Sequence, residues 1–100
     1  MPSAKPYQVD DRAWAEVEAA DDWYRERSPE AAVAFLVQVI EAFDTIARAP
    51  ETWPEYLYGT RRYLLRHFPF AVVYLVDPDV VTIVAVAHSK RKPGYWRKRV

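Results

Sequence analysis

The spacing of apolar residues changes once along this chain of 100 residues, and that change limits the folds open to it. Up to about residue 49, apolar side chains recur every three or four residues, which is the period of an amphipathic helix. From about residue 61 they alternate or run continuously, and β-branched and aromatic residues dominate, as in strands. A helical part followed by a strand-rich part predicts an α+β fold, with helices on one face of a sheet.

The helical part predicts a hairpin of two helices. Asp10 or Asp11 is expected to cap the first helix, and Ser28 with Pro29 suits the cap and first turn of the second, because proline has no N–H to lose there. The second helix is expected to end near Pro50. The apolar residues predicted to face the core are Ala13, Trp14, Val17, Ala20, Trp23 and Tyr24 in the first helix, and Val33, Leu36, Val37, Ile40, Phe43, Ile46 and Ala47 in the second.

The strand-rich part predicts three strands, at about residues 61–68, 70–77 and 80–88, and residues 5–9 suit one short strand before the helices. Pro69 fits a junction and Asp77-Pro78-Asp79 a hairpin turn, so these strands are expected to pair antiparallel. The segment FAVVYLV is apolar on both faces, whereas the helices cover only one. Either Tyr95-Trp96 folds back over the second face or a protein partner covers it.

Composition excludes several classes of site. The chain has no cysteine, so disulfides, thiolate zinc sites and a cysteine nucleophile are ruled out. Its only glycines, Gly59 and Gly94, form no phosphate loop, and His67 and His88 lack metal-ligand spacing, so no cofactor is expected. The first ten residues lack a secretory apolar run and no stretch is long enough to span a membrane. We expect one cytoplasmic domain, residues 1–100, without membrane association.

Charge is divided between two parts of the sequence, although the formal net charge is zero. Residues 1–57 hold twelve acids and five bases, and residues 58–100 hold nine bases and two acids. A basic tail, about residues 88–100, interleaves cations with Tyr95 and Trp96, a pattern that suits phosphate contact and base stacking. A solvated tail that keeps the protein soluble is the alternative.

His88 closes the last predicted strand and is followed by Arg91 and Tyr95. A histidine can exchange a proton near neutral pH, an arginine can stabilise charge on a phosphate, and a tyrosine can donate a proton or stack. This set would support RNA cleavage without a metal, by attack of a ribose 2′-OH. A structural histidine at the end of a strand is the alternative, for His88 and still more for His67.

The segment RRYLLRHFPFAVVYLVDPDVVTIVAVAHSKRKPGYW resembles the RelE/ParE superfamily of type II toxin–antitoxin toxins, and WYRERSPEAAVAFLVQVIEAFDTIARAPETWP resembles that family's helical hairpin. The resemblance implies a β-α-α-β-β-β domain with the helical hairpin on one face of an antiparallel sheet. It also implies a bacterial cytoplasmic toxin, silenced by a cognate antitoxin in a hetero-oligomer.

The family resemblance carries two activities, ribosome-dependent mRNA cleavage and poisoning of DNA gyrase, of which only the first is enzymatic. The resemblance places Arg61, Arg62 and Arg66 on the strand where the nuclease branch carries cations, and Arg91 and Tyr95 after the last strand. With His88 and the basic tail added from their position, the predicted catalytic residues are Arg66, His88, Arg91 and Tyr95, and the predicted substrate-binding residues are Arg61, Arg62, Lys90, Lys92, Trp96 and Arg97. Tyr58-Gly59-Thr60 stands where many nuclease members have a lysine pair, and the tail that begins at His88 is more similar to the gyrase-directed branch and to branches of unassigned activity. A non-toxic RNA-binding or adaptor module of the same fold is the alternative function.

Overall fold

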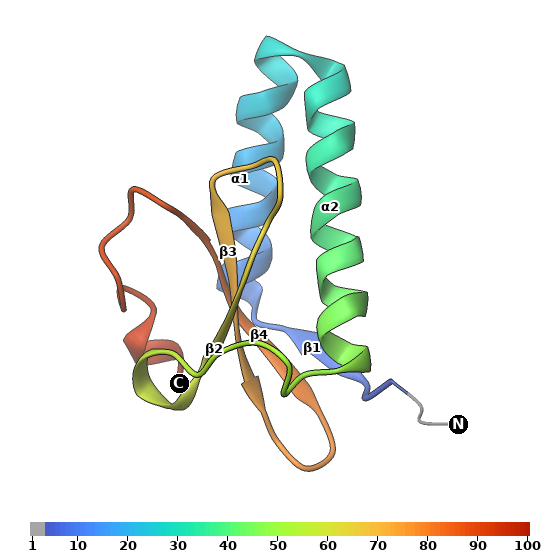
Figure 1. The fold of residues 1–100 in the computed structure, drawn as a ribbon. Coiled ribbons are helices and arrows are strands. Elements are labelled where there is room, and N and C mark those ends of the chain that lie inside the picture. The colour runs from blue at the N-terminus through green and yellow to red at the C-terminus, as the bar shows by residue number, and fades with distance from the viewer. Residues whose placement is uncertain (1–3) are drawn as a thin grey trace.

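The structure is a computed structural model that describes residues 4–100, and it places two helices against one side of a four-stranded sheet (Figure 1). The elements are β1 (Tyr7–Val9), α1 (Asp11–Arg27), α2 (Pro29–Arg48), the short 3-10 turn η1 (Leu57–Gly59), β2 (Arg61–Leu64), β3 (Phe70–Val76), β4 (Val81–His88) and a second 3-10 turn, η2 (Arg97–Arg99). The prediction of a cytoplasmic protein used the first ten residues, of which residues 1–3 lie outside the described part. Within that part, no helix is long and apolar enough to cross a membrane.

The predicted capping residues begin both helices. The carboxylate of Asp10 accepts a hydrogen bond from the backbone N–H of Arg12 at 2.8 Å. The hydroxyl of Ser28 accepts one from the N–H of Ala31 at 3.2 Å, and Pro29 is the first residue of α2. These bonds satisfy N–H groups that the first turn of a helix leaves without a partner.

The strand order is β1-β4-β3-β2, and the sheet is mixed rather than wholly antiparallel. β2, β3 and β4 pair antiparallel as predicted, but β1 runs parallel to β4, with Tyr7 opposite Val81. A strand separated from its neighbour by a long helical connection is free of the hairpin geometry that enforces antiparallel pairing. β2 is shorter than predicted, because residues 65–69 bend away toward α2, where Gln38 hydrogen-bonds His67 at 2.9 Å.

The helix-covered face of the sheet holds the main core. There Phe35, Val39 and Phe43 of α2 are buried with Val72, Tyr74 and Ile83 of the sheet. The predicted orientation of α2 is wrong in part: Val33, Val37 and Ile40 are 57%, 49% and 43% exposed. Because α2 is apolar around most of its circumference, the side with the large Phe35 and Phe43 rings packs on the sheet instead. Trp14 and Trp23 of α1, also predicted as core, are exposed.

The C-terminal tail, residues 89–100, folds back over the second face of the sheet (Figure 1). Trp96 is 1% exposed and packs with Val73, Val84 and Ala85, with Tyr56, Leu75 and Tyr95 at the border of this small cluster. A bulge in β4 makes room for the contact: Val73 pairs with Ala85 and Tyr74 with Ile83, so Val84 is an extra residue in the ladder. The sequence left open whether Tyr95-Trp96 or a protein partner covers this face, and in the structure the tail covers it.

Candidate functional site

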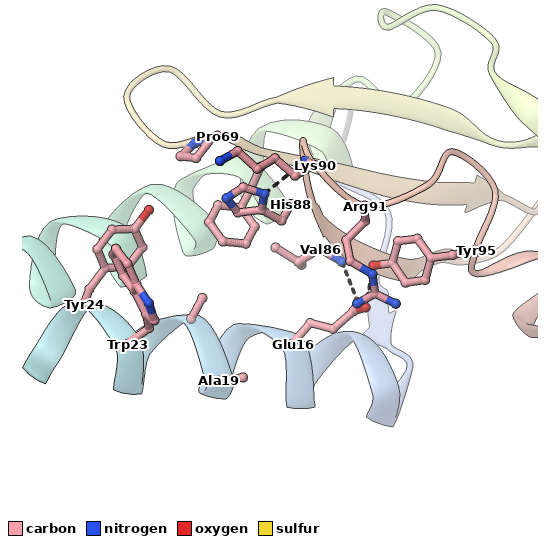
Figure 2. Close-up of a pocket in the computed structure, with 12 residues that line it drawn as sticks. Glu16, Ala19, Trp23, Tyr24, Pro69, Val86, His88, Lys90, Arg91 and Tyr95 are labelled. Atoms are coloured by element: carbon pink, nitrogen blue, oxygen red, sulfur yellow. Dashed lines mark hydrogen bonds between the residues drawn. The ribbon is translucent and has the colours of Figure 1, made fainter.

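A groove of about 560 Å³ opens between α1 and the end of β4, and the start of the tail forms one side of it (Figure 2). Its lining is largely apolar and aromatic. The residues around it are Glu16, Ala19, Ala20, Trp23, Tyr24, Pro69, Phe70, Val86, His88, Lys90, Arg91 and Tyr95. The groove therefore combines an apolar wall with two cations, Lys90 and Arg91, from the tail.

Three of the four predicted catalytic residues, His88, Arg91 and Tyr95, line this groove together. The fourth, Arg66, is exposed in the connection between β2 and β3 and is not among the groove residues. Sequence reasoning thus predicted the convergence of residues that lie close in the sequence. It did not predict the separation of Arg66 from them.

The ring of His88 is held in one orientation by two contacts. Its Nδ1 accepts a hydrogen bond from the backbone N–H of Lys90 at 3.0 Å, and its centroid lies 5.0 Å from that of Phe70 in an edge-on arrangement. A neutral imidazole that accepts at Nδ1 carries its proton on Nε2. In that tautomer Nε2 can donate a proton, but while the bond to Lys90 is kept the ring offers no free lone pair with which to take one from a substrate.

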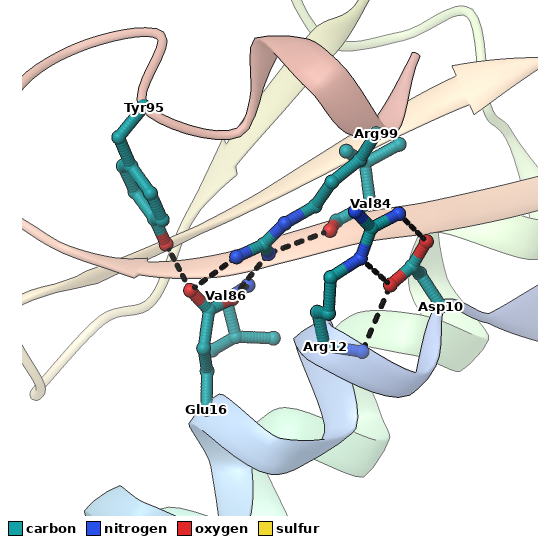
Figure 3. Close-up of polar contacts among 7 residues, drawn as sticks. All are labelled: Asp10, Arg12, Glu16, Val84, Val86, Tyr95 and Arg99. Atoms are coloured by element: carbon teal, nitrogen blue, oxygen red, sulfur yellow. Dashed lines mark hydrogen bonds and ion pairs between the residues drawn. The ribbon is translucent and has the colours of Figure 1, made fainter.

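The hydroxyl of Tyr95 is engaged with Glu16 of α1 (Figure 3). It donates a hydrogen bond to one carboxylate oxygen, and Arg99 donates to both oxygens at 3.0 and 3.3 Å. Burial raises the pKa of Tyr95, and the neighbouring Glu16 carboxylate raises it further. Tyr95 therefore remains protonated at neutral pH, with its proton committed to Glu16 rather than directed at a substrate.

An arginine–tyrosine cluster, formed by Tyr56, Tyr58, Tyr95, Arg62, Arg91 and Arg97, surrounds Trp96. The Trp96 ring lies 6.1 Å from Tyr56 and 5.9 Å from Tyr58, centroid to centroid. The guanidinium carbons of Arg62, Arg97 and Arg91 lie 4.2, 4.8 and 3.8 Å from the ring centroids of Tyr56, Tyr58 and Tyr95, respectively. Stacking of this kind fixes a guanidinium while its N–H groups stay available to an anion.

Within the described residues, most of the cations of β2, of the loop after it and of the tail have no carboxylate within 4 Å. This group comprises Arg62, Arg66, Lys90, Arg91, Lys92, Arg97 and Lys98. Lys92 lines a small hollow of about 90 Å³ together with Arg62 and Arg91, on the other side of the tail from the groove. The tail thereby places Arg91 and Lys92 beside Arg62 of β2.

Two residues predicted to bind substrate make structural contacts within the chain. Arg61 donates to the carbonyl oxygen of Trp53 at 2.6 Å and lies 3.8 Å from a Glu55 oxygen, so it ties down the connection before β2. Trp96 is buried and presents no exposed face to a ligand; its part is to hold the surrounding rings. Among residues 4–100, no group of three or more acidic or histidine side chains is placed to hold a metal ion.

Comparison with protein families places this fold and tail in context. A family model described as the ParE toxin of the type II toxin–antitoxin system, parDE, matches residues 7–93. The chain belongs to the ParE toxin family. The match runs from β1 into the tail and ends before Tyr95 and Trp96.

Among solved structures, a chain from the chromosomal ParDE toxin–antitoxin system of P. aeruginosa is similar to this ParE-family toxin, with a TM-score of 0.77. The two are 19% identical, over 87% of this chain and 98% of that one. This likeness supports the fold. A comparison with proteins of curated function gave no match.

The site of this ParE-family chain includes residues that the sequence analysis did not single out. Glu16 follows the buried Ala13 by three residues and precedes the buried Ala20 by four, so it sits at the border of the apolar stripe of α1. A carboxylate at such a border indicates a buried ion pair. The sequence does not identify its partner, because Arg99 is 83 residues away. Tyr56 and Tyr58 lay in a proline-rich connection with no periodicity to place them.

Proposed function

We propose that this ParE-family toxin arrests growth by binding DNA gyrase through the cationic side formed by β2 and the tail, and not by cleaving RNA. The observation that carries the proposal is the state of the predicted proton-transfer groups. The His88 ring accepts at Nδ1 from Lys90, and the Tyr95 hydroxyl donates to Glu16. An RNase needs a group free to remove a proton from the ribose 2′-OH, whereas a toxin that acts by binding does not.

The cations in the same region are arranged for contact with an anionic surface. Arg62, Arg91 and Arg97 are each stacked on a tyrosine and none is neutralised by a carboxylate in the described part of the chain. Pre-ordered guanidinium groups lose less side-chain freedom when they bind. Such a surface suits stoichiometric capture of a large target, with the antitoxin of the toxin–antitoxin system competing for the protein.

Purified protein should therefore inhibit supercoiling by gyrase and leave mRNA intact on programmed ribosomes. Single alanine variants of Arg62, Arg91 and Arg97 should each weaken inhibition by about two- to fivefold, because exposed charge contacts contribute modestly and separately. Lys98→Ala is a control for net charge, since Lys98 stacks on none of the cluster tyrosines.

His88→Ala separates the two activities most sharply. Gyrase inhibition should change little in this variant. If the wild-type protein cuts mRNA on ribosomes and His88→Ala lowers that cleavage by about 10²-fold or more, the protein is a nuclease and the proposal is overturned. Cells that grow normally while producing the chain without antitoxin would point instead to the non-toxic adaptor module.

A further inference from the structure

Three parts of the chain that are distant in sequence meet at the carboxylate of Glu16 (Figure 3). From α1, Glu16 accepts hydrogen bonds from the backbone N–H of Val86 in β4 at 3.1 Å and from the tail residues Tyr95 and Arg99. Arg99 also donates to the carbonyl oxygen of Val84 at 3.1 Å. The acid and the arginine are 16% and 13% exposed, so this is an enclosed ion pair.

The position of Glu16 also places Arg91. The Tyr95 ring, fixed at its hydroxyl by Glu16, lies beneath the Arg91 guanidinium, whose carbon is 3.8 Å from the ring centroid. Among residues 4–100, Arg91 has no carboxylate within 4 Å, and the aromatic ring that its guanidinium contacts is that of Tyr95. Figure 2 shows Glu16, Tyr95 and Arg91 together at one end of the groove.

We infer that Glu16 is a positioning residue that holds Arg91 at the groove through the ring of Tyr95. The inference rests on the proposed function in one respect, that Arg91 contacts the target. Arg99 has a different part, since it neutralises Glu16 and joins the end of the tail to β4. Without Arg99 the carboxylate would be enclosed and uncompensated, which is unfavourable.

A purely structural role for Glu16 would also weaken the toxin when the residue is changed, so the test needs a readout specific to Arg91. The Nε–H proton of Arg91 should show a ring-current shift in NMR spectra, because the guanidinium lies over Tyr95. Glu16→Gln keeps the shape of the side chain but removes its charge. Its Arg91 signal should move toward the value of an unstacked arginine, and the tail amides of Arg97 and Arg99 should exchange at least about tenfold faster with solvent.

Val39→Ala is the matched control. Val39 is fully buried on the helix-covered face, away from the tail, so its truncation lowers thermal stability without touching the network. In this variant the Arg91 NMR signal should match that of the wild type. The hydrogen-exchange rates of the tail amides should also match, once they are corrected for the lower global stability of the variant. Tyr95→Phe gives a second route if Glu16→Gln does not fold: it keeps the ring but deletes the bond to Glu16, and should shift the Arg91 signal in the same direction.

A double-mutant cycle on gyrase inhibition tests whether Glu16 acts through Arg91. If it does, Glu16→Gln with Arg91→Ala should be about as weak as Arg91→Ala alone, because the change at Glu16 has nothing left to act through. The inference would be overturned if the losses of inhibition in the two single variants multiply in the double variant, or if the Arg91 NMR signal is unchanged in Glu16→Gln. The NMR measurements use the toxin alone, so they remain decisive even if the wild-type protein does not inhibit gyrase, an outcome that would refute only the proposed function.

Discussion

The two faces of the sheet are covered in different ways. On one face, two helices of 17 and 20 residues bury a continuous core that includes Phe35, Phe43 and Tyr74. On the other face, a tail with one short 3-10 turn buries Trp96 against Val73, Val84 and Ala85. The difference indicates that the first face stabilises the fold, whereas the second mainly positions the side chains of the tail.

The largest expected effect is on the helix-covered face. Phe35→Ala removes a ring that packs with Tyr24, Phe68 and Phe70, and should lower the free energy of unfolding by about 3–5 kcal/mol. Urea unfolding followed by far-UV circular dichroism measures this. A loss near 1 kcal/mol would mean that the main core tolerates the cavity and that the comparison between faces is wrong.

Trp96→Ala should have a smaller effect on stability, although the deleted side chain is larger. Because its neighbours form a thin cluster that can be solvated locally, we expect a loss of no more than about 2 kcal/mol. Amide hydrogen exchange should show the tail opened and the helices still protected. Global unfolding of this variant would show that the two faces form one cooperative unit.

Alkaline pH should act on the helix-covered face through Tyr74. Burial raises its pKa to about 12, although nearby Arg61 opposes the shift, and its hydroxyl donates to the Pro50 carbonyl oxygen at 2.7 Å. The pKa is higher in the folded than in the unfolded state, so this contribution is complete below about pH 10 and is lost as pH rises toward 12. At about pH 11 the loss should be on the order of 1 kcal/mol. Denaturation titrations should show it in the wild type and show a smaller loss in Tyr74→Phe.

The smallest effect is expected at the exposed stripe of α2. Val37→Ser changes a side chain that is 49% exposed, so the free energy of unfolding should change by about 0.5 kcal/mol or less. Thermal unfolding measures the change, with Val39→Ala as the buried counterpart on the same helix. A loss at Val37 as large as that at Val39 would mean that the stripe is covered in solution.

Sequence patterns predicted the elements well because local chemistry determines them. Asp10, Ser28 and Pro29 act within one turn, and the alternation of residues 70–88 is a property of each strand. The face that α2 buries could not be predicted in the same way, because Val33 and Val39 satisfy helical periodicity equally well. Only the shape of the sheet distinguishes them. The parallel pairing of β1 likewise depends on where the chain returns after the helices.

The candidate site shows the same limit. His88, Arg91 and Tyr95 were predicted to lie together because they are near neighbours along the chain, and they line one groove. The bond that sets the chemical state of Tyr95 comes from Glu16 of α1, which no spacing rule connects to the tail. Pattern reasoning therefore predicted that these three residues meet, whereas the state of the Tyr95 proton depends on a contact between distant segments.

The short length of β1 has a consequence for the protein in a crowded cell. β1 ends at Val9, opposite Ile83, so the rest of β4 has no neighbouring strand on that side. There Glu16 binds the Val86 N–H and Arg99 binds the Val84 carbonyl oxygen. Open strand edges invite pairing with other chains and the growth of aggregates. Glu16 and Arg99, which lie near opposite ends of the sequence, thus occupy two of the bonding positions that an added strand would need at this edge.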